Sequence, residues 1–155
     1  LPYAFAAHFA PAMLDQAATI YQQNFKPSEH LKEPYFMVCV NIIAADTNEE
    51  AEFLSTSLQN LFAGIVTNRR MPLSAPTEKP IFAGIPEIEQ AVYSMTSSTF
   101  TGNPDKLAVD LKNLIRNVNA QEIMTTNYIF DDEKRLKAFD LIKNTFDIIN
   151  QDSNK

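Results

Sequence analysis

Glycine and cysteine are both scarce in this sequence. With 3 glycines in 155 residues and no GxGxxG or P-loop motif, a backbone cradle for a phosphate group is not expected. The single cysteine, Cys39, excludes an internal disulfide. It lies in the apolar run YFMVCVNII, which predicts a buried and inert thiol. The sequence also lacks HExxH and CxxC, so we expect no metal site.

Clustered positive charge is missing as well. The formal net charge is -6, and lysines and arginines are dispersed except at Arg69-Arg70, which argues against nucleic acid as a partner. No apolar run approaches the roughly 20 residues that span a bilayer, and the first residues do not resemble a signal peptide. We therefore expect a cytoplasmic protein with no membrane contact. A hydrophobic fraction of 45% is typical of a packed globular chain.

Three segments are predicted to be β-strands: residues 2–9, 36–44 and 122–129. The middle segment gives the clearest signal. It is almost continuously apolar and rich in β-branched residues, which is typical of a strand covered on both faces in a parallel sheet.

Helices are predicted over residues 11–25, 47–66, 104–118 and 132–149 from apolar residues at helical spacing. Thr47 and Glu50 form a capping-box pattern, and Asn103 followed by Pro104 is a strong helix start. Prolines interrupt residues 69–98, which we interpret as an insertion or lid loop with at most a short helix around 86–95. The polar residues 151–155 are expected to form a disordered tail.

The element order predicts an α/β fold with three βα units and an insertion before the third. Such units either close into a barrel or extend as an open sheet. Three parallel strands cannot close a barrel, which needs eight, and their free edges would expose backbone groups. We therefore expect the chain to be part of a longer polypeptide, with its strands covered by something other than its own helices.

Candidate functional residues lie where predicted strands end, since this is where parallel β/α proteins place their chemistry. His8 is the titratable residue at the end of the first strand, beside Ala6 and Ala7. It either faces a ligand or forms a hydrogen bond within the rim of the sheet.

The remaining charged candidates have simpler interpretations. Asp46, Asp131 and Asp132 each begin a predicted helix, and helix starts favour acidic side chains. Arg69 and Arg70 open the insertion, where they either reach an anionic ligand or are solvated.

Four stretches together resemble the luciferase-like flavin-dependent monooxygenases, in the branch of small bacterial oxidoreductases: LPYAFAAHFAP, PYFMVCVNIIAADTNEEAEFL, TGNPDKLAVDLKNLI and EIMTTNYIFDDEKRLKAFDLI. The resemblance implies that residues 1–155 are the C-terminal portion of one TIM (β/α)8 barrel domain. The N-terminal half of that barrel would then precede Leu1.

The resemblance also implies an activity. Family members bind reduced FMN, usually supplied by a separate reductase, and use dioxygen to oxidise a small organic substrate. It places Ala6, Ala7, His8 and Phe9 near the flavin, His8 as the candidate catalytic residue, and Arg69 and Arg70 in a mobile active-site loop.

The expected partners are the missing half of the barrel or another copy of the chain. We expect the chain to be incomplete as an enzyme by itself. The alternative is a non-catalytic fragment that acts as an oligomeric or interaction module.

Overall fold

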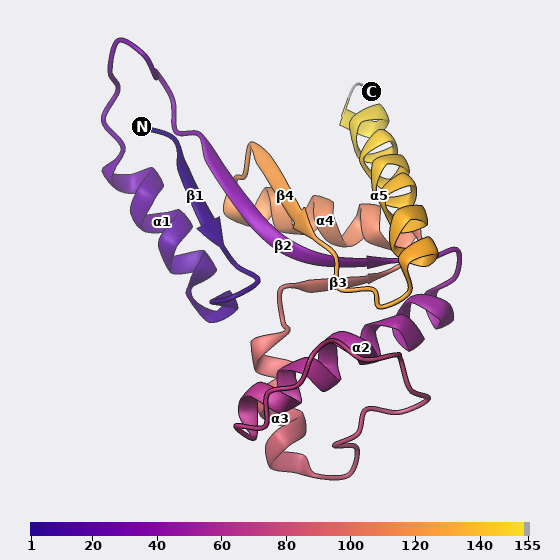
Figure 1. Ribbon diagram of the computed structural model, residues 1–155. Coiled ribbons are helices and arrows are strands. Elements are labelled where there is room, and N and C mark those ends of the chain that lie inside the picture. Colours follow the sequence, from indigo (N-terminus) through magenta and orange to yellow (C-terminus); the bar gives the residue numbers. More distant parts are fainter. Residues whose placement is uncertain (154–155) are drawn as a thin grey trace.

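A computed structural model describes residues 1–153 as a parallel sheet with helices (Figure 1). The strands are β1 (Tyr3–Ala6), β2 (Phe36–Ala44), β3 (Thr99–Gly102) and β4 (Glu122–Thr126). The helices are η1 (Pro11–Met13, a 3-10 turn), α1 (Leu14–Asn24), α2 (Asn48–Val66), α3 (Pro86–Met95), α4 (Pro104–Val118) and α5 (Asp132–Ser153).

β2 is the central strand, and all three of its neighbours run parallel to it. β1 pairs with residues 36–39 and β3 with residues 41–44. The backbone groups of Cys39 and Asn41 bond to His8 and Ser98, respectively, whereas Phe36 bonds to Gln121 before β4. Because alternate residues of a strand point their backbone groups to opposite edges, β1 and β3 lie end to end along one edge and β4 along the other.

The parallel pairing of the three predicted strands is confirmed, but the expectation of only three strands and three βα units is wrong. β3 adds a fourth strand, followed by its own helix α4. Its sequence is the four residues TFTG, too short for an alternating pattern to be visible. β1 and β4 are also shorter than predicted, because a turn follows Ala6 and an irregular loop follows Thr126.

Helices cover one face of the sheet. Figure 1 shows α1 beside β1 and α4 behind the sheet. Alternate residues of β2 belong to one buried apolar cluster with residues of these helices: Phe36, Val38, Val40, Ile42, Leu14, Ala18, Leu107, Leu111 and Val118. This cluster is the main core. Burial of such side chains contributes about 1.5–3 kcal/mol each.

The opposite face of the sheet is open around β1 and β4. Ala4 and Ala6 of β1 are in register with Met37 and Cys39 of β2, and Cys39 is in register with Met124 of β4. Ala4 and Ala6 are exposed, and 51% of Met124 is exposed. The chain itself therefore leaves part of this face uncovered.

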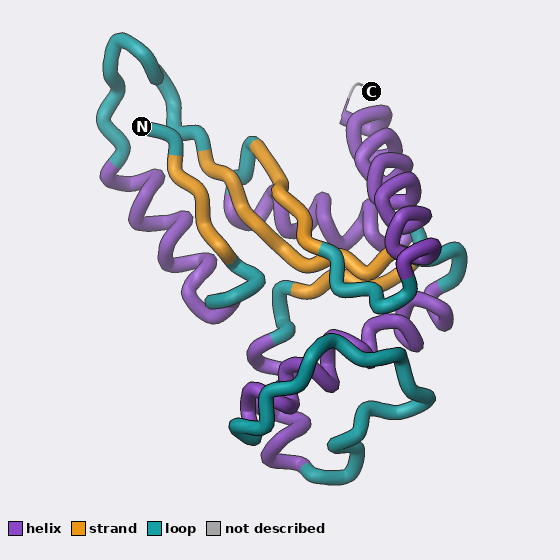
Figure 2. The backbone as a smooth tube through the Cα atoms, in the orientation of Figure 1, coloured by secondary structure: helices purple, strands orange, loops and turns teal. Residues whose placement is uncertain are grey.

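The insertion is folded against α2. Figure 2 shows a long loop that leaves α2 and returns to α3 beside it. Leu58, Phe62 and Ala63 of α2 form a second apolar cluster with Phe82 and Val92. The Asn60 side chain accepts a hydrogen bond from the amide of Ile81 (2.9 Å), so the loop is fixed to α2 by polar as well as apolar contacts.

The short helix expected around residues 86–95 is confirmed as α3. The tail expected over 151–155 is helical as far as Ser153, because α5 continues there, while residues 154–155 lie outside the described part. Within that described part, no helix combines the length and the apolar character needed to cross a membrane.

Candidate functional site

The carboxyl ends of β1, β2 and β4 carry the candidate site, as expected for parallel strands. After β1, Ala7 is fully buried in the main core, His8 is half-buried, and Phe9 is 72% exposed. Of the three apolar candidates for a ligand wall, Ala6 and Phe9 thus face solvent and Ala7 does not. Among the candidates predicted from the sequence, the one within β1 whose side chain is available to a ligand is therefore Ala6.

His8 is held at the rim by β2. Its amide donates to the Cys39 carbonyl at 3.1 Å, and its Nδ1 lies 3.4 Å from the same oxygen. Its ring is tilted against that of Phe9, with centroids 4.1 Å apart. With Nδ1 directed at a carbonyl, Nε2 is the ring nitrogen that remains for another partner.

A buried polar network joins the three strands β2, β3 and β4 beside His8. Asn41 is 1% exposed, and its amide nitrogen donates to the Thr99 hydroxyl at 3.2 Å. The Thr126 hydroxyl donates to the Asn41 amide oxygen at 2.5 Å. The sequence interpretation missed these residues, although an asparagine inside the apolar run YFMVCVNIIAA was a visible signal.

A second polar group lies just beyond β4. The Asn127 amide oxygen accepts a hydrogen bond from the amide of Ile129 at 3.0 Å. Its amide nitrogen is buried and has no hydrogen-bond partner among the described residues. The next residue, Tyr128, packs against both apolar clusters. Because a buried donor without a partner costs about 1–3 kcal/mol, Asn127 is a further candidate for ligand contact.

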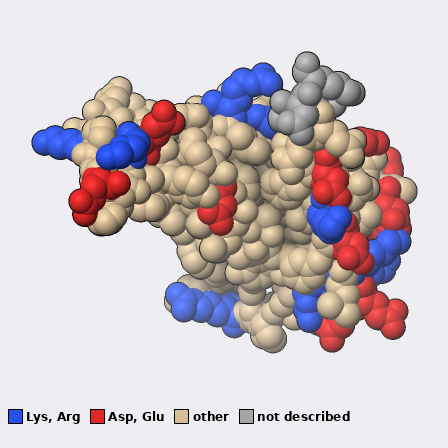
Figure 3. Space-filling view, turned by 90° about the horizontal axis from the view of Figure 1, so that it is seen from above, with Lys and Arg blue, Asp and Glu red and all other residues tan. Residues whose placement is uncertain are grey.

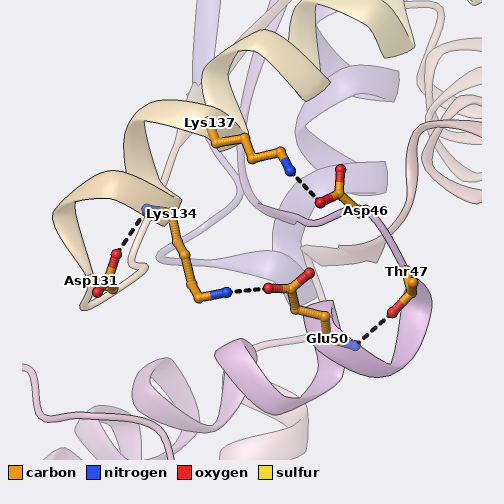
Figure 4. A network of polar contacts seen from close by, with 6 residues as sticks. All are labelled: Asp46, Thr47, Glu50, Asp131, Lys134 and Lys137. Atoms are coloured by element: carbon orange, nitrogen blue, oxygen red, sulfur yellow. Dashed lines mark hydrogen bonds and ion pairs between the residues drawn. The ribbon is translucent and has the colours of Figure 1, made fainter.

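The acidic residues at the strand ends are engaged in structural contacts (Figure 4). Asp46 pairs with Lys137, and Glu50 pairs with Lys134, so both pairs join the start of α2 to the start of α5. The hydrogen bond with Glu50 raises the pKa of Lys134 and keeps this lysine charged. No free carboxylate base is found among these residues.

The helix starts are capped partly as expected. The Thr47 hydroxyl accepts the Glu50 amide at 3.1 Å, so Thr47 caps α2, and Asp46 contributes an ion pair instead. Glu50 does not return to the cap as the capping box predicted, because its carboxylate binds Lys134. Asp131 accepts the Lys134 amide at 2.9 Å, and Asp132 pairs with Arg135. Their interpretation as residues of a helix start is consistent with these contacts.

Arg69 and Arg70 follow α2 and are exposed. The 19 residues of α2 place them roughly 28 Å along the helix axis from its start near the end of β2. Within the described residues, no hydrogen bond or ion pair joins either arginine to residues 6–9. That the two groups act on the same ligand stays a prediction.

Other chemistry is limited at these strand ends. Burial raises the pKa of the Cys39 thiol, which favours the unreactive protonated form. Among the described residues, no three His, Cys, Asp or Glu side chains lie close enough to hold a metal ion.

The open face fits one part of a flavin but not all of it. Ala4 and Ala6 form a flat, small-residue surface that a planar ring can approach, and His8 lies at its end. A phosphate group needs several donors or cations held together. Lys134 and Lys137 reach the end of β2, but each is paired with a carboxylate, Glu50 or Asp46. Within residues 1–153, no cation is hydrogen-bonded to Ala4, Ala6 or His8, so a phosphate-binding cluster is not formed beside this surface.

Comparison with models of protein families gave no match. Comparison with curated proteins did find relatives. The chain is 43% identical to a "Luciferase-like monooxygenase" of Escherichia coli K12 over 91% of its own length and 42% of that protein. It is 39% identical to the uncharacterized protein YvbT of Bacillus subtilis, over 92% of the chain and 42% of that protein. The chain therefore spans less than half the length of these relatives.

Two solved structures show a similar fold. The structure of apo-MsnO8 has a TM-score of 0.77 at 20% identity, covering 95% of this chain and 45% of that one. The structure of DmoA from Hyphomicrobium sulfonivorans has a TM-score of 0.50 at 12% identity, covering 83% and 33%. At these identities the likeness concerns the fold alone, and here too the chain matches only part of a larger structure.

Proposed function

Because the chain is homologous to the luciferase-like monooxygenases, we propose that it forms one wall of the active site of a flavin-dependent monooxygenase. The observation that carries this proposal is the open sheet face of small residues, Ala4 and Ala6, which ends at His8 and at the buried pair of Asn41 and Thr126. It is an apolar surface with polar groups at one end, as expected where a planar cofactor is held and oriented.

The proposed reaction is the oxidation of a small organic substrate by dioxygen. Reduced FMN, supplied by a separate reductase, provides two electrons, one oxygen atom enters the substrate, and the other leaves as water. The role of this chain is to bind and orient. Ala6 would lie against the ring. Nε2 of His8 would accept a hydrogen bond at the edge of the ring, because Nδ1 is directed at the Cys39 carbonyl and carries the N–H.

Asn41 and Thr126 act as positioning residues in this proposal. Their hydrogen bond, together with that between Asn41 and Thr99, fixes the relative positions of β2, β3 and β4 next to the rim. We propose that this chain is the C-terminal portion of a TIM barrel and that its partners are the remaining strands of that barrel. They would cover the open face and supply the phosphate site.

Titration of FMN, followed by quenching of its fluorescence, tests the proposal. We expect weak quenching by the 155-residue chain and tight, stoichiometric quenching by a longer polypeptide that adds the rest of the barrel. In that polypeptide, His8→Ala should slow oxidation of reduced FMN by about tenfold or more. His30→Ala is the matched control, because His30 is a solvent-exposed histidine paired with Glu29 in a loop.

Two results would contradict the proposal. Tight FMN binding by the chain alone would show that the phosphate site is complete within these residues. Equal oxidation rates for the His8→Ala and His30→Ala variants would remove His8 from the chemistry.

A second candidate function is an interaction module without catalysis. A groove of about 520 Å³ between β1 and α1, lined mainly by apolar side chains, favours this alternative. The interaction-module alternative predicts two outcomes: the longer polypeptide does not bind FMN, and another protein surface covers the groove.

A further inference from the structure

A second open groove lies in the insertion, at the end of α2. It has a volume of about 530 Å³ and lies between the last turn of α2, the returning loop and the start of α3. Ile81, Ile85 and Ile88 line it together with Phe82 and Met71. Ile81 is 61% exposed, and a cluster of exposed apolar side chains of this kind is typical of a binding surface.

The walls of this groove are fixed by hydrogen bonds. At the end of α2, the Arg69 amide donates to the Gly64 carbonyl at 2.7 Å, and the Asn68 amide donates to the Ile65 carbonyl at 3.1 Å. Asn68 has φ 55°, so this is a Schellman motif with asparagine in the left-handed position. On the other side, Asn60 holds the amide of Ile81.

Arg69 supplies the charge of the groove. It is the only charged residue among the described residues that line it. Glu78 of the returning loop and Glu87 and Glu89, which flank Ile88, are not part of the lining, and the Glu89 carboxylate accepts the Gly84 amide at 2.7 Å. The carbonyls of Ala63, Gly64 and Ile65 already accept hydrogen bonds from residues 67–69. Among the described residues, the hydrogen-bond donors that remain for a ligand at the groove are therefore those of the Arg69 guanidinium group.

We propose that this groove binds an amphiphile with one anionic head, a medium-chain carboxylate. The alkyl chain lies against the isoleucines, and the carboxylate accepts two parallel hydrogen bonds from Arg69. The groove volume falls within the range of about 300–1,000 Å³ that small-molecule sites occupy. The site is separate from the strand ends described above and does not depend on the proposed flavin chemistry.

Calorimetric titration of the 155-residue chain with sodium decanoate, below its micelle concentration and without flavin, tests the proposal. We expect one saturable site per chain. Arg69→Ala should weaken decanoate binding by about tenfold or more, because a hydrogen-bonded charge is lost. Arg70→Ala is the matched control, since Arg70 is also exposed and is adjacent but does not line the groove. The affinity of this variant for decanoate should change by less than about twofold.

Uncharged decanol separates the contribution of the head group from that of the alkyl chain. We expect it to bind the unaltered chain about as weakly as decanoate binds the Arg69→Ala variant. Equal affinities of decanol and decanoate would overturn the proposal, as would equal effects of the two arginine substitutions. Absence of saturable binding, or a dimer that forms through the groove and is not dissociated by decanoate, would also overturn it.

Discussion

At the scale of single residues, Asn41 connects the fold to the candidate site. Its amide is buried in the central strand and uses both of its polar atoms, one toward Thr99 of β3 and one toward Thr126 of β4. Buried polar groups of this kind are costly unless they are satisfied, so each partner depends on the others. The network thereby fixes which strands lie beside the rim that carries His8.

We predict that Thr126→Val lowers the free energy of unfolding by about 1–3 kcal/mol, because it leaves the Asn41 amide oxygen without its donor. Thr125→Val is the matched control: Thr125 is adjacent, projects to the other face of β4, and forms no side-chain hydrogen bond among those described. Urea unfolding of both variants measures the difference. Equal stabilities would show that the network contributes nothing.

At the scale of elements, α2 combines three functions in one helix. Its start is joined to α5 by the Glu50 ion pair, its middle carries the second apolar cluster, and its end fixes Arg69. Gly64 allows the backbone of Arg69 to approach α2, because a Cβ at residue 64 would lie 2.8 Å from the Arg69 carbonyl oxygen. The Ser57 hydroxyl, in the same helix, is buried and has no partner among the described residues.

Two alanine substitutions in α2 should therefore have opposite signs. Gly64→Ala should lower the free energy of unfolding by about 1 kcal/mol, because a clash with backbone, which costs about 1–3 kcal/mol, outweighs the better helix propensity of alanine. Ser57→Ala should raise it by about 1 kcal/mol, because an unsatisfied hydroxyl is removed. Thermal or urea unfolding measures both, and a stabilising Gly64→Ala would contradict the close approach.

At the scale of the whole molecule, the uneven covering of the sheet is the dominant feature. Helices cover one face, while Ala4, Ala6 and Met124 remain exposed on the other. Figure 3 shows a view in which charged groups lie mainly at the margins and other side chains fill most of the middle. Apolar surface and an open strand edge at β1 favour association with further protein.

We predict that the 155-residue chain associates with itself through the groove between β1 and α1 when no other strands cover it. Ile20→Glu, in this groove, should shift sedimentation toward the monomer, because it places a charge in an apolar contact. Val109→Glu on α4 is the matched control, with 59% of the side chain exposed against 53% for Ile20. A monomer at micromolar concentration that unfolds cooperatively would contradict this prediction.

The sequence by itself determined the helices, three of the four parallel strands and the relationship to a known family. The bounds of β2 and α4 could be predicted because each depends on local signals: a continuous apolar run for β2, and Asn103 followed by Pro104 for α4. The resemblance to luciferase-like monooxygenases rested on four stretches in order, and it was confirmed by the relatives.

Only the tertiary structure decided which residues lie together at the strand ends. Asn41, Thr99 and Thr126 are far apart in the sequence, and β3 exists because β2 offers it free backbone groups beyond the end of β1. Arg69 and His8 were grouped by the resemblance, and that grouping stays a prediction. Local patterns specify elements, whereas strand pairing and burial depend on contacts between distant residues, which no single segment of the sequence records.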